Sequence, residues 1–98
     1  MIETVSFHSM AEFELNEAAE YYELRIEGLG DSFIFEVERV TKLIQQNPES
    51  GLKVFGKIRK KILWRFPYSL LYSVKENSIR IIAIANQKRR PFYWRGRK

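Results

Sequence analysis

The chain has 98 residues, of which 45% are hydrophobic and 14% aromatic, and this composition excludes a disordered chain because so much apolar surface can offset the entropy cost of ordering. It has no cysteine and one histidine, His8, which argues against a disulfide framework, a metal site and a Ser-His triad. We expect one globular domain over residues 1–98, with no metal and no small-molecule cofactor.

The formal net charge of +5 conceals a difference between the two halves of the chain. Residues 1–50 hold eleven acidic and three basic residues, whereas residues 51–98 hold one acidic and fourteen basic residues. The basic half predicts attraction to a polyanion or to an acidic protein. The N-terminus lacks the pattern of a signal peptide, and no run of about 18 apolar residues is present. We therefore expect a cytoplasmic protein without membrane contact.

The first expected elements are a short strand over residues 4–8, where polar and apolar residues alternate, and a helix that begins at Ser9. Ser9 and Glu12 have the spacing of a capping box. Four apolar residues follow at helical spacing and predict a buried stripe: Ala11, Leu15, Ala18 and Tyr22. The glutamates around this stripe are expected to form a solvated face and not an acid–base site, and they are Glu12, Glu14, Glu17, Glu20 and Glu23.

Gly28-Leu29-Gly30 predicts the end of this helix and a tight reversal into a second one. Either Asp31 or Ser32 could cap the second helix, and Asn47-Pro48 would end it. Its expected buried stripe is Phe33, Val37, Val40 and Ile44. The two helices should form an antiparallel hairpin, with Tyr22 in its core and Tyr21 at its rim.

Three strands are expected in the second half, after a loop over residues 49–57. A period of two begins at Ile58 and directs Arg59, Lys61 and Arg65 toward one outward face. Residues 68–75 and 79–85 form the next two strands, joined by a hairpin turn. The expected fold class is α+β, in the order β-α-α-β-β-β, with an antiparallel sheet and the helical hairpin packed on one face.

The chain ends with cations and aromatic residues, Lys88-Arg89-Arg90-Pro91-Phe92-Tyr93-Trp94. Such a mixture can stack on nucleic-acid bases. For Phe92 and Trp94 we favour the alternative that they fold back onto the sheet, because large aromatic side chains contribute most when buried. The role of Tyr93 stays open. Likewise, Arg59, Lys61 and Arg65 could either join these cations in a target surface or form an ordinary outward sheet face.

The order of these segments resembles the RelE/ParE superfamily of bacterial toxins, over nearly the whole chain. The resemblance is carried by Tyr21-Tyr22, Gly28-Leu29-Gly30, the run from Phe66 to Tyr72, the run from Ile81 to Ala85, and the ending Lys88 to Trp94. It is greatest for the ParE-like branch, often labelled plasmid stabilisation proteins. It implies a toxin of a type II toxin–antitoxin module, held inactive by a cognate antitoxin.

The resemblance implies one of two targets: ParE-like members poison DNA gyrase, and RelE-like members cut mRNA on the ribosome without a metal. In the second case it places the catalytic roles on Lys60 or Lys61, Arg89 and Tyr93. This chain departs from the ribonuclease branch at Ser69, where an arginine is expected, and at Asn86, where many relatives have histidine. We therefore expect a gyrase-directed docking surface, with candidate residues Arg59, Lys61, Arg65, Lys88, Arg89, Arg90 and Tyr93.

Overall fold

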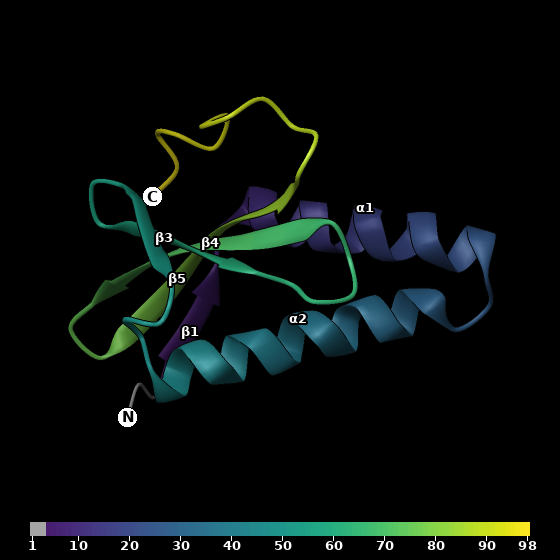
Figure 1. The fold of residues 1–98 in the computed structure, drawn as a ribbon, viewed down its shortest axis with the longest axis horizontal. Helices are drawn as coiled ribbons and strands as arrows, with labels where there is room; N and C mark the ends of the chain where they lie inside the picture. The colour runs from purple at the N-terminus through teal and green to yellow at the C-terminus, as the bar shows by residue number, and fades with distance from the viewer. Residues whose placement is uncertain (1–3) are drawn as a thin grey trace.

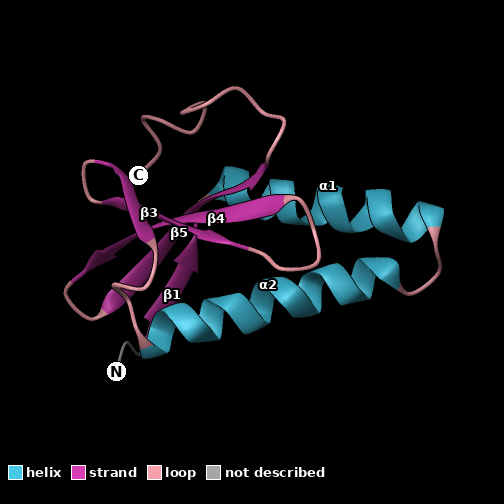
Figure 2. Cartoon of the chain, in the orientation of Figure 1, coloured by secondary structure: helices cyan, strands magenta, loops and turns pink. Residues whose placement is uncertain are grey.

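The computed structural model describes residues 4–98 and confirms the α+β fold with its helical hairpin (Figure 1). The elements are β1 (Thr4–Phe7), α1 (Ser9–Arg25), α2 (Leu29–Gln46), β2 (Leu52–Phe55), β3 (Ile58–Ile62), β4 (Tyr68–Lys75) and β5 (Ser78–Asn86). The strands form one sheet in the order β1-β5-β4-β3-β2, with both helices on the same side of it (Figure 2). Within residues 4–98, no helix is long and apolar enough to cross a membrane.

The sheet differs from the expected antiparallel arrangement in two respects. Strand β1 pairs with β5 in parallel, with Thr4 opposite Ser78 and Phe7 opposite Ile81. These two strands lie far apart in the sequence, so no short turn sets their relative direction. The second difference is β2, an edge strand within the segment expected to be a loop. Its four residues are too few to give a clear periodic signal.

The helix caps also differ from those expected. The helix α1 includes Ser9, and the capping group is the His8 imidazole, whose Nδ1 accepts from the Met10 amide at 3.0 Å. The α2 cap is Gly28, in the left-handed conformation with φ of 86°, and neither Asp31 nor Ser32 caps this helix. Instead, the Glu23 carboxylate of α1 accepts 2.9 Å hydrogen bonds from the amides of Gly28 and Gly30. One acidic side chain thus fastens the turn between the helices.

The helical hairpin packs its predicted stripes against β4 and β5. Ala11 and Ala18 of α1 and all four predicted residues of α2 are buried. Tyr22 lies among three other rings, with centroid distances of 5.5 Å to Phe33, 4.9 Å to Phe66 and 6.2 Å to Tyr68. Tyr21 is exposed and contacts Tyr22 edge-on. The prediction of a core tyrosine beside a rim tyrosine is therefore confirmed.

A bulge in the β4–β5 pairing creates a second, smaller core on the opposite face of the sheet. The register shifts between Leu71 and Tyr72, and two consecutive β5 residues, Ile82 and Ala83, then join Leu71 on the face away from the helices. A bulge commonly changes the side on which neighbouring side chains lie. This second core is the base on which the C-terminal segment rests.

The loop after β3 is held by a buried carboxylate on α2. Glu36 accepts two 2.9 Å hydrogen bonds from the Arg39 guanidinium and one 2.9 Å bond from the Trp64 amide. The hydrogen bonds from Arg39 lower the pKa of Glu36, against the opposing effect of burial. The Trp64 indole itself is 83% exposed, with the Arg39 guanidinium 4.6 Å from its ring centroid.

Candidate target-binding site

The C-terminal tail, residues 87–98, leaves the end of β5 and crosses back over the sheet face opposite the helices (Figure 1). It consists of successive turns, with backbone bonds from Tyr93 to Arg90 and from Arg95 to Phe92. Trp94 is 5% exposed and packs on the second core, which confirms the prediction that it folds back. Phe92 is 44% exposed and meets Trp94 edge-on, so for this residue the prediction holds only in part.

The tail is tied to the first helix through Glu14. The Tyr93 hydroxyl donates to Glu14 Oε2 at 2.7 Å, and the Arg97 guanidinium donates to both carboxylate oxygens at 3.0 and 3.2 Å. The same carboxylate accepts from the Ile84 amide at 3.0 Å. Ile84 lies beyond Ile81, the last β5 residue that pairs with β1, so β1 offers no hydrogen-bond acceptor to the Ile84 amide. The Glu14 carboxylate is the acceptor instead.

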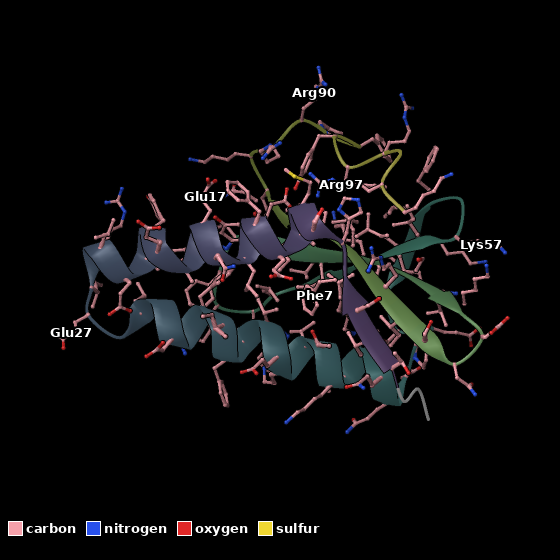
Figure 3. All side chains as sticks on the ribbon, turned by 180° about the vertical axis from the view of Figure 1, so that it is seen from behind. Phe7, Glu17, Glu27, Lys57, Arg90 and Arg97 are labelled. Atoms are coloured by element: carbon pink, nitrogen blue, oxygen red, sulfur yellow. The ribbon has the colours of Figure 1, made fainter. Side chains whose placement is uncertain are left out.

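This network corrects the expectation that the glutamates of α1 form a solvated face. The Glu14 and Arg97 side chains are 10% and 14% exposed, and Figure 3 shows Arg97 turned into the body of the protein. A buried carboxylate needs such partners, because an unpaired buried charge is strongly unfavourable. The remaining glutamates Glu12, Glu17, Glu20 and Glu23 are exposed, as expected, although Glu23 also caps α2.

A groove of about 320 Å³ lies between the tail and the sheet. We call it the tail groove. Its walls combine β-strand residues with the root of the tail: Val54, Lys60, Ile62, Ser69, Leu71, Ala85, Asn86, Gln87, Arg89, Arg90, Pro91, Phe92, Tyr93 and Trp94. Three cations from two distant parts of the sequence, Lys60, Arg89 and Arg90, therefore lie around one concavity.

The two arginines of the groove are presented differently. Arg90 projects away from the protein (Figure 3). The Arg89 guanidinium lies 3.9 Å from the centroid of the Tyr93 ring. This cation–π contact restricts the position of the guanidinium. Because Tyr93 is in turn bonded to Glu14, the position of Arg89 depends on the attachment of the tail to α1.

The structure does not bring all predicted cations together. Arg59 pairs with Tyr72 and Lys61 pairs with Leu70, and both partners belong to the core beneath the helices. Arg59 donates to the carbonyls of Glu49 and Gly51 at 3.1 and 2.7 Å, so it holds the segment that leads into β2. The prediction that Arg59 and Lys61 share a face with the tail cations is wrong.

The remaining candidates occupy other places. Lys60, which the alternation set on the inner side of the strand, pairs with Leu71 of the second core and faces the tail groove. The strand β3 ends at Ile62. Arg65 lies in the exposed loop after β3, near the Phe66 ring at 5.7 Å. Lys88 lines a second pocket, between the tail and α1.

Both departures from the ribonuclease pattern lie in the wall of the tail groove. Ser69 is buried and supplies no charge there. The Asn86 side chain accepts from the Lys88 amide at 2.8 Å and so shapes the turn that starts the tail. At these two positions the groove has a small hydroxyl and an amide, where the ribonuclease branch would have an arginine and an imidazole.

The acid–base properties of the groove follow from Tyr93. Burial, followed by its hydrogen bond to Glu14, raises the pKa of the Tyr93 hydroxyl far above the ordinary value of 10. The phenol stays protonated at neutral pH, and its proton is directed at Glu14, away from any bound substrate. The groove can thus attract an anion, but Tyr93 is poorly placed to transfer a proton. In the described range, no cluster of three or more residues suits a metal ion.

Sequence reasoning missed Glu14, the residue that organises the site. The signal was its position three residues after Ala11 and four before Ala18, both in the buried stripe, so that it borders that stripe on the helix surface. Its tail partners could not be inferred, since they lie 79 and 83 residues further along the chain.

Comparison with known proteins identifies the fold. A chain of the solved structure titled "Chromosomal ParDE TA system from P. aeruginosa" superposes with a TM-score of 0.75, over 87% of this chain and 96% of that chain. The two sequences are 20% identical, and at that level the likeness establishes a shared fold. No protein-family model and no curated protein matches the chain.

Proposed function

We propose that this chain is the toxin component of a type II toxin–antitoxin module. The observation that carries the proposal is the shared fold with a chain of a ParDE system over almost the full length of both chains. The sequence motifs that resemble the RelE/ParE superfamily point the same way. The partner would be a cognate antitoxin with an acidic, amphipathic segment suited to the basic half of the chain, where fourteen of the seventeen basic residues lie.

We propose further that the toxin acts in the ParE-like manner, by poisoning DNA gyrase. The tail groove with Lys60, Arg89 and Arg90 would be part of the docking surface, because these cations surround one concavity and both arginines are exposed. The cations on the other face of the sheet, Arg59 and Lys61, are then structural, and Arg59 in particular is bonded to two carbonyls.

The alternative is metal-independent cleavage of mRNA on the ribosome. One observation favours this alternative: the tail groove is lined by all three of Lys60, Arg89 and Tyr93. Two observations argue against this alternative. The groove wall has Ser69 and Asn86 where the ribonuclease branch has an arginine and a histidine, and the Tyr93 hydroxyl already donates its hydrogen bond to Glu14. A ribonuclease site needs a group that accepts or donates a proton at the reacting oxygen. Ser69, Asn86 and the Glu14-bonded Tyr93 do not supply such a group.

The proposal is tested by inducing the gene in a bacterial host. Growth should stop after induction, and co-expression of the small gene encoded beside it should restore growth and give a stable complex of the two products. Continued growth at a verified level of folded protein would contradict the toxin proposal. Growth arrest without rescue by any flanking product would contradict the proposed antitoxin partner.

A further inference from the structure

The helix α1 has apolar residues on two opposite faces. One face is buried in the hairpin core, as described above. On the other face four large apolar side chains are exposed: Met10 by 44%, Phe13 by 55%, Tyr21 by 50% and Leu24 by 80%. With 100° of rotation per residue, these four positions fall within an arc of about 80°, so they form one stripe along the helix. We call this stripe the α1 ridge.

The α1 ridge exposes more large apolar side chains than the solvent-facing side of a helix usually does. Single exposed apolar residues are common, but two pairs of large apolar side chains on one side of a helix, Met10 with Phe13 and Tyr21 with Leu24, are a candidate interaction surface. The described ring contacts of the ridge are the edge contact of Tyr21 with Tyr22 and the Arg25 guanidinium 4.2 Å from the Tyr21 ring. The ridge therefore has the features of a docking face.

The charges beside the α1 ridge define its partner. Helix α1 carries five glutamates and one arginine, and at 100° per residue Glu17 lies within the ridge and Glu20 at its border. Figure 3 shows Glu17 on the side of α1 that faces away from α2. Carboxylates around an apolar stripe favour a segment with apolar side chains flanked by lysine or arginine. They oppose nucleic acid and anionic lipid, which carry the same sign of charge.

A second copy of the chain is a poor occupant of the ridge. A two-fold contact would bring identical patches together. Glu17 and Glu20 of both copies would then lie in one interface, and four carboxylates gathered there are destabilising when the contact excludes water.

The surface beside the ridge also offers a concavity. A pocket of about 330 Å³ lies between α1 and the root of the tail, lined by Glu17 and Tyr21 on the helix side and by Tyr68, Lys88 and Arg89 across from them. One large side chain of a bound helix could enter there while its neighbours lie on the ridge, the arrangement of helix-in-groove recognition.

We propose that the α1 ridge binds a basic amphipathic helix of another protein. This surface goes beyond the proposed function, because that function places an acidic antitoxin segment and the gyrase contact on the basic half of the chain. The protein would thus have two docking surfaces of opposite charge, the ridge on α1 and the tail groove, with Arg89 at the border of both pockets.

The test uses the full-length protein and a fluorescent helical peptide of about 18 residues, roughly the length of α1, with leucines at helical spacing and lysines elsewhere. A second peptide keeps the leucines and replaces every lysine by glutamate. The variants are Phe13→Ser/Leu24→Ser, which removes apolar area from the ridge, and Glu17→Gln/Glu20→Gln, which removes charge. Phe35→Ser on α2 is the matched control, since Phe35 is also highly exposed.

We expect the lysine peptide to bind at least about tenfold more tightly than the glutamate peptide, and the Phe13→Ser/Leu24→Ser variant to lose at least about tenfold in affinity. The charge variant should bind more weakly and with less dependence on salt, and Phe35→Ser should bind as the wild type does. Circular dichroism checks that each variant is folded. Equal binding of both peptides, an equal loss in Phe35→Ser, or a dimer of the protein that Phe13→Ser/Leu24→Ser dissociates would overturn the proposal.

Discussion

The hydroxyl of Tyr93 in the C-terminal tail donates a 2.7 Å hydrogen bond to the carboxylate of Glu14 in the first helix. The two residues are 79 positions apart, and their contact fixes how the tail lies across the sheet. Arg89 stacks on the Tyr93 ring, so the contact also fixes a cation of the proposed docking surface. The stability of the tail and the toxicity that we propose for the protein should therefore be linked through Glu14.

Replacing Glu14 by alanine should loosen the tail. The change leaves the Arg97 guanidinium, the Tyr93 hydroxyl and the Ile84 amide without their shared partner, and we expect a loss of about 3 kcal/mol in the free energy of unfolding.

The loosening can be measured by the fluorescence of Trp94. In a Trp64→Phe background Trp94 is the remaining tryptophan, and Glu14→Ala should shift its emission to longer wavelength and increase its quenching by acrylamide. The control is Glu17→Ala, an exposed glutamate on the same helix, which should change neither quantity appreciably. A Trp94 signal unaffected by Glu14→Ala would show that the tail is held by other contacts.

Replacing Tyr93 by phenylalanine separates docking from proton transfer. The ring beneath Arg89 remains, and the hydrogen bond to Glu14 is lost, so stability should fall by about 1 kcal/mol. Arg97 still ties the tail to Glu14 in this variant, so if the groove is a docking surface the variant should remain toxic at the wild-type level of induction. Loss of toxicity in a folded Tyr93→Phe protein would favour the ribonuclease alternative, in which the phenol takes part in the chemistry.

Reversing the charge at Arg89 and Arg90 should abolish toxicity without unfolding the protein. Both residues are exposed, so Arg89→Glu/Arg90→Glu should change the free energy of unfolding by less than about 1 kcal/mol. The matched control, Lys57→Glu/Lys75→Glu, makes the same change in net charge at exposed residues that do not line the tail groove. Toxicity should survive in the control. Equal loss in both variants would attribute the effect to overall charge and not to the groove.

The stability contributed by Glu36 should disappear in acid. Its pKa lies below the ordinary value of 4.5 because Arg39 bonds to its ionised form. The contribution is therefore complete above about pH 5 and falls as the pH drops through the lowered pKa of the folded state. At pH 7 Glu36→Gln should cost about 2 kcal/mol, and urea titrations of both proteins should give a difference that narrows below pH 4. A difference that stayed constant down to pH 2 would contradict this assignment.

The helical half of the fold could be predicted from sequence because its signals are local. Phe33, Val37, Val40 and Ile44 repeat at helical spacing and all four are buried. The helix caps were missed, because several capping groups compete near each helix start and local sequence does not rank them. His8 prevailed over Ser9, and Glu23 bonded to the turn at Gly28 from the preceding helix.

The candidate site was predictable only in part, because it is assembled from residues that tertiary structure brings together. Alternation along β3 correctly placed Lys60 on the opposite face of the sheet from Arg59 and Lys61. It did not indicate which of the two faces the tail would cover. That choice depends on the β5 bulge, which moves Ile82 and Ala83 to the face where Trp94 packs. The role of Glu14 depends on the tail in the same way.

The proposed mode of action is tested most directly with purified components. The protein is incubated with DNA gyrase, ATP and supercoiled plasmid, and the products are treated with detergent and protease. A parallel reaction contains ribosomes translating a labelled mRNA. The docking account predicts linear plasmid that increases with the wild-type protein and not with Arg89→Glu/Arg90→Glu, together with intact mRNA. Cleaved mRNA on the ribosome, with gyrase unaffected, would contradict it.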